Sequence, residues 1–286
     1  MCNKYSDIGF EDYNSCADDT INADGTIRKY KIYLLWILHN SYNNLLIGSG
    51  CYGQHFLYQI NHNLNIIKRN FMKQTNHFPT YITVSSVQSY TGNYLFTSWQ
   101  MKYIMVYDCN FNLLYHIYLR DDDICRMSGM TMFHNISSIC SDLYGNIYTM
   151  TDRNPIINKY NEKGVFTKSV DSKDDTYSNC ICQYKSQIIS LNVNDGLLKI
   201  YDTDLHSVSN HKIHAEEKNI YDTKCYVCSD LLYIKYKDGI RGYDMRKIRP
   251  GNNEPIDIIN VNSDPSNFTI IDGRLLISDG DRLYYH

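Results

Sequence analysis

Residues 139–170, ICSDLYGNIYTMTDRNPIINKYNEKGVFTKSV, hold four short apolar runs separated by clusters of turn-forming residues. The runs are rich in Ile, Val, Thr and Tyr, which favour strands, and none follows the spacing of an amphipathic helix. Gly145 and Gly164 stand in turns that need a positive φ, which glycine adopts at little cost. Strands of about five residues joined by loops of about four predict an antiparallel meander.

The same pattern recurs along nearly the whole chain. We align the repeats on the second strand of each, which is the most apolar. These strands start at Leu45, Tyr94, Ile147, Ile188, Leu232 and Leu275. A period of roughly 40 to 50 residues with four strands per repeat is typical of a β-propeller.

The third strands of the repeats share a second feature. Most of them place a tyrosine near the strand end, at Tyr58, Tyr107, Tyr160, Tyr201 and Tyr243. An Asp or Asn follows several of these tyrosines, at Asp108, Asn161, Asp202 and Asp244. Because Asp and Asn side chains bond to the backbone two residues on, we expect these residues to open the next turn.

The repeats predict an all-β fold, a six-bladed β-propeller of four-stranded antiparallel blades over residues 26–286. Residues 1–25 are acidic and lack apolar periodicity, so we expect a poorly ordered tail. The last repeat has only three strands, at 267–271, 274–279 and 282–286. Because an open edge is a liability, we expect the N-terminal strand 26–33 to pair with 282–286 and close the ring. Seven blades are the alternative if residues 120–134 contain further strands.

The stretch 139–170 resembles one repeat of the NHL family, whose pattern runs roughly D-x-x-G-N-[IL]-Y-V-x-D and then I-x-K-[FY]-[DN]-x-x-G. The matching residues are Asp142, Gly145, Asn146, Ile147, Tyr148, Asp152, Ile157, Lys159, Tyr160, Asn161 and Gly164. The resemblance is close over this repeat and loose elsewhere, and it implies a propeller blade. It implies no single function, because such propellers bind proteins, RNA or sugars, or catalyse hydrolysis.

Composition restricts the classes of partner. The net charge of −3 disfavours binding to nucleic acid or to an anionic membrane, which both need a basic surface. No apolar stretch is long enough for a transmembrane helix and no signal peptide is visible, so we expect an intracellular protein, cytoplasmic or virion-associated. The 27 tyrosines, against 9 Phe and 2 Trp, indicate an AT-rich coding sequence, as in some protists and large DNA viruses.

Cysteines in the first strands are the candidates for metal ligands. They are Cys140, Cys180, Cys182, Cys225 and Cys228. On a strand, Cys225 and Cys228 fall on opposite faces, whereas a structural zinc site needs converging ligands. We therefore expect free core thiols, no metal and no cofactor. The acidic residues lie mainly at turns, and no catalytic motif is recognisable, so no catalytic residue is predicted.

Long loops between repeats are the remaining candidates for a site. They combine acidic runs with Met and aromatic residues, which suits a protein-binding surface. The predicted partner-binding residues are Phe78, Asp121, Asp122, Asp123, Met127, Met130, Met132, Phe133, Asp174, Asp175, Tyr177 and Tyr221. We expect a non-catalytic interaction or scaffolding propeller that binds a basic protein through this long-loop face. The alternatives are a metal-dependent hydrolase similar to gluconolactonases and an RNA-binding NHL-like module.

Overall fold

A computed structural model describes most of the predicted strands. It describes residues 5–6, 33–39, 45–51, 54–60, 66–72, 85–88, 92–97, 103–110, 112–119, 124–127, 130–133, 136–151, 156–171, 180–215, 224–251, 253–260, 267–271, 274–279 and 282–285. Every described regular element is a strand, and all the strand pairs are antiparallel. No helix in the described residues is long and apolar enough to cross a membrane. The chain divides into two compact units, Ile82–Pro265 and a unit made of Met1–Tyr81 with Ser266–His286.

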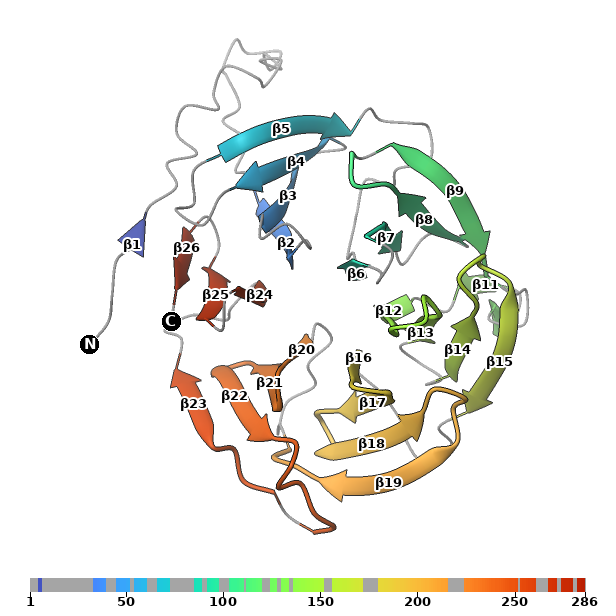
Figure 1. Cartoon of the computed structure of the whole chain (residues 1–286), viewed down its shortest axis with the longest axis vertical. Helices are drawn as coiled ribbons and strands as arrows, with labels where there is room; N and C mark the ends of the chain where they lie inside the picture. The colour runs from blue at the N-terminus through green and yellow to red at the C-terminus, as the bar shows by residue number, and fades with distance from the viewer. Residues whose placement is uncertain are drawn as a thin grey trace. The chain divides into compact units, whose positions relative to one another are not determined.

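In its described residues, the unit Ile82–Pro265 contains four four-stranded sheets, each formed by strands in chain order (Figure 1). The first sheet is β6 (Ser85–Gln88), β7 (Tyr94–Thr97), β8 (Tyr103–Tyr107) and β9 (Leu113–Tyr118). The second is β12 (Ile136–Ser141), β13 (Ile147–Thr151), β14 (Ile156–Tyr160) and β15 (Phe166–Asp171). The third is β16 (Cys180–Tyr184), β17 (Gln187–Asn192), β18 (Leu197–Asp202) and β19 (Ser207–Lys212). The fourth is β20 (Cys225–Cys228), β21 (Leu231–Tyr236), β22 (Gly239–Asp244) and β23 (Asp257–Asn260).

The same unit also contains a two-stranded hairpin within residues 120–134. Its strands are β10 (Ile124–Met127) and β11 (Met130–Phe133). The sequence predicts seven blades in place of six if this stretch contains further strands. Among the residues that the structure describes, these two strands pair with each other alone, as a separate sheet.

The described part of the other unit forms two four-stranded sheets. One is β2 (Tyr33–His39), β3 (Leu45–Cys51), β4 (Gln54–Ile60) and β5 (Ile66–Met72). The second has the order β1 (Tyr5–Ser6), β26 (Arg282–Tyr285), β25 (Arg274–Asp279) and β24 (Asn267–Ile271). The strands expected from the repeat are therefore present in both units. Closure of the two units into a six-bladed ring stays a prediction.

The strand beside β26 differs from the predicted one. Tyr5 pairs with Tyr284 and Ser6 with Leu283, so β1 comes from the segment expected to be a tail. Tyr33, the last residue of the predicted closing strand, instead begins β2 and pairs with Gly50. Residues 26–32 lie outside the described part of the chain. A two-residue strand is too short to show any periodicity, which is why the sequence did not indicate β1.

Neighbouring sheets of the unit Ile82–Pro265 pack against each other through their faces. The first strands β6, β12, β16 and β20 contact one another in that order. Three buried clusters join successive sheets, and each contains apolar residues from two sheets: Ile117 with Ile139, Ile157 with Ile188, and Leu198 with Ile234. The outer strand β15 alternates half-buried and exposed residues, as expected when only one of its faces is covered.

The predicted turn chemistry is confirmed. Asp108 and Asp202 each accept hydrogen bonds from the backbone N–H groups two and four residues on, at 2.8 to 2.9 Å. Asn161 does the same at 2.9 to 3.0 Å. Gly145 and Gly164 have φ of 81° and 77°. In these three turns between a third and a fourth strand, one side chain thus closes the turn and fixes where the outer strand begins.

Candidate functional site

The twelve predicted partner-binding residues divide into two groups. Met127, Met130, Met132 and Phe133 belong to the hairpin β10–β11. The others lie outside the described residues: Phe78, Asp121, Asp122, Asp123, Asp174, Asp175, Tyr177 and Tyr221. The stretch expected to be a loop is therefore a regular hairpin where it carries the methionines.

The register of the hairpin sorts its residues onto two faces. Met127 pairs with Met130 and Cys125 with Met132, while Ile124 pairs with Phe133. Since residues on a strand alternate between faces, the three methionines and Cys125 fall on one face and Phe133 on the other. The hairpin thus has a methionine face that includes three of the nine methionines of the chain.

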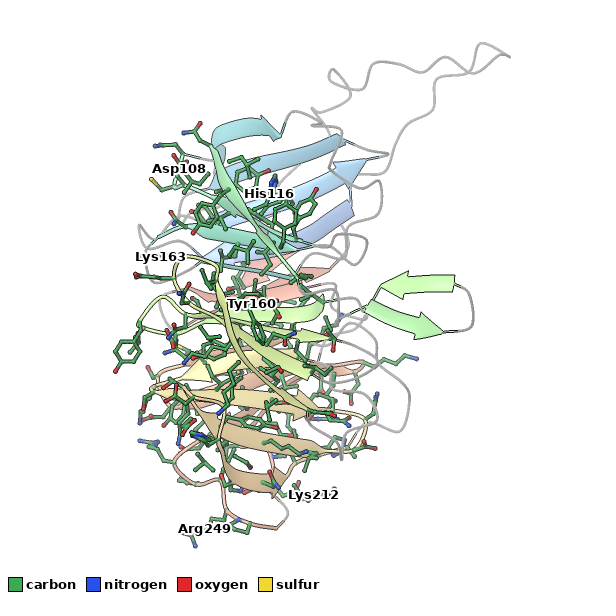
Figure 2. All side chains as sticks on the ribbon, turned by 90° about the vertical axis from the view of Figure 1, so that its right-hand side faces the viewer. Asp108, His116, Tyr160, Lys163, Lys212 and Arg249 are labelled. Atoms are coloured by element: carbon green, nitrogen blue, oxygen red, sulfur yellow. The ribbon has the colours of Figure 1, made fainter. Side chains whose placement is uncertain are left out.

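Within the unit Ile82–Pro265, the hairpin projects from the four-stranded sheets, as Figure 2 shows in pale green. It lies on the side opposite the turns that carry Asp108 and Lys163. The order of the elements along the chain agrees with this placement. The hairpin lies before the first residue of β12 and the turn of Asp142 after its last residue, so the two lie at opposite ends of that strand. A projecting hairpin can contact a partner without any rearrangement of the sheets.

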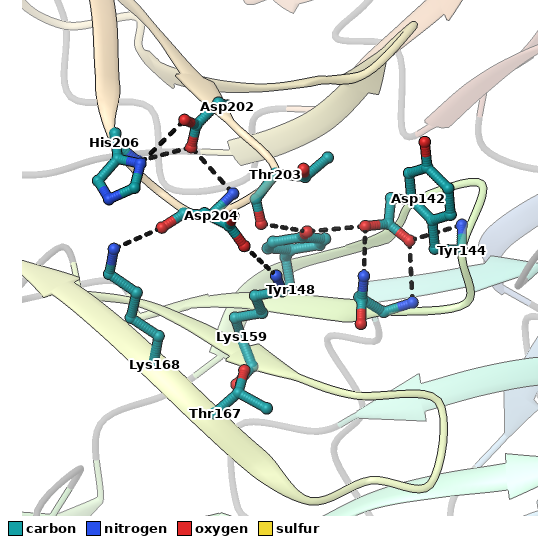
Figure 3. A network of polar contacts seen from close by, with 11 residues as sticks. Asp142, Tyr144, Tyr148, Lys159, Thr167, Lys168, Asp202, Thr203, Asp204 and His206 are labelled. Atoms are coloured by element: carbon teal, nitrogen blue, oxygen red, sulfur yellow. Dashed lines mark hydrogen bonds and ion pairs between the residues drawn. The ribbon is translucent and has the colours of Figure 1, made fainter.

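A second candidate is a polar network between two adjacent sheets, centred on Asp142 (Figure 3). Asp142 is 1% exposed and accepts hydrogen bonds from the backbone N–H groups of Tyr144 and Asn146, both at 2.9 Å. The Asn146 side-chain amide donates to it at 2.7 Å. The hydroxyl of fully buried Tyr148 lies 2.8 Å from both Asp142 Oδ2 and the carbonyl oxygen of Thr203, on the next sheet. Burial and Asp142 together raise the pKa of Tyr148, so its hydroxyl stays protonated and donates.

Asp204, from the same turn as Thr203, extends the network to β14 and β15. Lys159 and Lys168 lie directly opposite each other on paired strands. Two like charges in this position repel each other and destabilise the sheet. Asp204 compensates for this repulsion, because Lys159 Nζ lies 2.9 Å from its carboxylate and Lys168 Nζ donates to its carbonyl oxygen at 2.6 Å. The hydrogen bond from Lys159 holds the pKa of Asp204 below its usual range. The network thus joins the second sheet to the third (Figure 3).

A similar arrangement joins the third sheet to the fourth. Tyr184 donates to Asp230 at 2.7 Å, and Lys185 Nζ lies 2.9 Å from the same carboxylate. Arg246 forms ion pairs with Asp244 at 2.9 Å and with Asp230 at 3.6 Å. The hydrogen bonds from Lys185 and Tyr184 lower the pKa of Asp230, and those from Arg246 lower the pKa of Asp244. These titratable groups are engaged with one another, which favours a structural role.

The first-strand cysteines are core thiols, as predicted. Cys140, Cys180, Cys182 and Cys225 are free and buried on β12, β16 and β20, and Cys228 is half-buried. Burial raises the pKa of Cys140 and Cys225, and a hydrogen bond with Cys225 together with burial raises that of Cys182. Protonated thiols are poor nucleophiles. Within the described segments, no group of three or more His, Cys, Asp or Glu is arranged to hold a metal ion.

The sequence did not indicate the polar networks, although it contains their main signal. Asp142, Asn146 and Tyr148 were recognised as parts of the repeat, and their turn was predicted. The partner groups Thr203 and Asp204 lie more than one repeat further along the chain. Such pairings depend on the packing of sheets, which periodicity within one repeat does not encode.

No protein-family model matches this chain, and no curated protein matches it. Solved structures do match. The WD40 β-propeller domain of Doa1 has a TM-score of 0.59 at 12% identity, covering 88% of this chain and 77% of that one. A streptogramin B lyase has a TM-score of 0.60 at 10% identity, covering 90% of this chain and 98% of that one. A gluconolactonase from Xanthomonas campestris has a TM-score of 0.60 at 10% identity, covering 89% and 86%.

These similarities concern the fold. The stacked four-stranded antiparallel sheets and the matching structures together show that the chain has a β-propeller fold, as the repeat predicted. The matching proteins include a WD40 domain, a lyase and a lactonase, so the shared fold does not carry a function with it.

Proposed function

We propose that this β-propeller is a non-catalytic interaction module that binds another protein through the face carrying the hairpin β10–β11. The observation that supports the proposal is the methionine face of that hairpin, which combines Met127, Met130 and Met132 on an element that projects from the sheets (Figure 2). Methionine side chains are flexible and polarisable, and they are frequent in protein-binding surfaces. The binding energy would come from burying this face against the partner.

Acidic residues near the hairpin in the sequence indicate the charge expected on the surface of the proposed partner. Asp121, Asp122 and Asp123 directly precede β10 in the sequence, and the chain as a whole carries a net charge of −3. Acidic groups beside an apolar contact attract a basic surface and accelerate association at low salt. The partner is therefore a protein with a basic patch, and its association should slow as ionic strength increases.

The test compares variants on the two faces of the hairpin. The immobilised full-length chain is incubated with native extract, and captured proteins are quantified for wild type, for Met130→Ala combined with Met132→Ala, and for Thr131→Ala. The affinity for the partner is expected to fall about 30-fold in the double variant, since loss of two anchoring side chains costs on the order of 2 kcal/mol of binding free energy. Thr131 falls on the opposite face of the same strand and serves as the matched control.

Two results would contradict the proposal. One is a captured protein that responds equally to the double variant and to Thr131→Ala. The other is hydrolysis of lactones or phosphoesters by the purified chain that a chelator abolishes, which would favour the metal-dependent hydrolase. Binding of RNA with a steep salt dependence would instead favour the NHL-like RNA-binding alternative.

A further inference from the structure

The outer strand β9 exposes four large apolar or aromatic side chains, whereas the outer strands β19 and β23 of the same unit each expose one, Val208 and Ile258. Leu113, Leu114, Tyr115 and Tyr118 are 41%, 48%, 38% and 71% exposed. The sequence of β9, LLYHIY, contains no Asp, Glu, Lys or Arg. The outer strands β15, β19 and β23 each contain at least one such residue: Lys168, Asp171, Lys212 and Asp257.

Strand β9 is also an open edge. In the sheet order β6-β7-β8-β9 it is the last strand, and β8 is the one strand paired with it among those that the structure describes. Unpaired N–H and C=O groups along an edge strand can accept another strand, and proteins usually prevent this with charged residues on the edge. β9 has no such residue, so nothing in its sequence opposes the addition of a strand.

The exposed tyrosines of β9 are held in place. The Tyr118 ring lies 5.9 Å from that of Tyr103 and 6.3 Å from that of His116, both in edge-to-face contact. The Tyr115 hydroxyl donates to the backbone carbonyl of Glu162 at 3.4 Å. Both side chains are therefore positioned before any partner arrives, which reduces the entropy lost on binding.

We propose that β9 pairs with β9 of a second copy of this chain, as an antiparallel and two-fold symmetric extension of the sheet. An antiparallel pair of identical strands is self-complementary. If one residue of the first copy contacts a second residue of the other copy, the same two residues also meet with the copies exchanged. With β9, this pairing sets Leu, Ile, Tyr and the one histidine, His116, opposite one another, and it brings together no Asp, Glu, Lys or Arg. The interface is separate from the hairpin and does not depend on the function proposed for it.

A second copy fits this edge better than a charged peptide. A basic or acidic peptide would find no opposite charge on β9, whose one titratable side chain other than tyrosine is His116. An identical strand finds aromatic and aliphatic groups matched in number and size. Pairing would continue the sheet β6–β9 into that of the second copy.

Light scattering coupled to size-exclusion chromatography tests this proposal across a range of concentrations of the full-length chain. Wild type is expected to approach twice the 33.5 kDa mass of one chain as the concentration rises. Leu114→Lys combined with Tyr118→Lys should remain at 33.5 kDa, with the far-UV circular dichroism of wild type. Val208→Lys is the matched control, because Val208 is 56% exposed on the outer strand β19 and its variant should still dimerise.

Hydrogen exchange of wild type supplies a second measurement that needs no variant. The amides of residues 113–118 should exchange at least several-fold more slowly at dimer-forming concentrations than at low concentration, and those of β19 should not change. A wild-type chain that stays at 33.5 kDa at every concentration would overturn the proposal and leave β9 to a strand from a different protein. A dimer that survives the double lysine variant, or a dimer with unchanged β9 exchange, would overturn it as well.

Discussion

Replacing Asp142 by alanine is expected to lower the free energy of unfolding by about 3 kcal/mol, because several buried donors lose their acceptor together. The carboxylate is 1% exposed and receives the backbone N–H groups of Tyr144 and Asn146, the Asn146 amide and the Tyr148 hydroxyl. Water cannot easily replace it at that depth. Urea denaturation gives the change as a lower midpoint at constant slope.

Two further variants separate the buried network from the turn. Asp108→Ala removes an equivalent turn acceptor at an exposed position and should cost about 1 kcal/mol. Asp142→Asn retains one acceptor oxygen for the backbone but presents an amide where Tyr148 and Asn146 donate, so its effect should lie between the two. If Asp142→Ala costs no more than Asp108→Ala, Asp142 only closes a turn and does not join the sheets.

Replacing Gly239 by alanine is expected to cost about 3 to 5 kcal/mol, the range of severe backbone conflicts. Gly239 begins β22 with φ of 153°, a conformation that side-chain-bearing residues rarely adopt. An added Cβ would clash with the backbone carbonyl oxygen of Ile259 on the paired strand β23. Relief of that contact requires β22 and β23 to separate. The added Cβ is bonded directly to the backbone of residue 239, and the oxygen belongs to the backbone of Ile259, so no side-chain rotation can move them apart.

Gly92→Ala is the matched control for that prediction. Gly92 also has a positive φ, of 85°, but its added Cβ would meet no atom within 4 Å. Its cost is therefore limited to the backbone conformation, about 1 kcal/mol. Thermal denaturation of both variants distinguishes the two contributions, and equal losses would show that the contact with Ile259 is unimportant.

The strands could be predicted from the sequence because their signals are local. The predicted second strands at Leu45, Tyr94 and Ile147 begin at those residues in β3, β7 and β13. Apolar strands recur in every repeat and the turn residues Asp or Asn in most of them, so the repeats together give a clearer signal than any one of them. The identity of the strand next to β26 has no such repetition, and β1 was missed.

The candidate site was predicted only in part, for a physical reason. The stretch with Met127, Met130 and Met132 was recognised from its composition, but further strands within residues 120–134 were considered only as an alternative. Apolar runs of four residues give a weak strand signal, even with Ser128-Gly129 between them as a turn signal. The contact of Tyr148 with Thr203 and the apolar edge of β9 depend on which sheets are adjacent. The sequence pattern shows which side chains of a strand can be buried. The strands against which they are buried depend on how the sheets pack, which the local pattern does not encode.

Site-specific photocross-linking tests the central claim, that the hairpin face binds a protein, most directly. A benzoylphenylalanine residue replaces Cys125, which falls on the methionine face of the hairpin, in one variant and Tyr144 in another. Tyr144 is 71% exposed and lies in the turn after β12, at the opposite end of that strand from the hairpin. Illumination in native extract is predicted to give one discrete protein adduct from position 125 and none from position 144. An adduct from position 144 with none from position 125 would contradict the account.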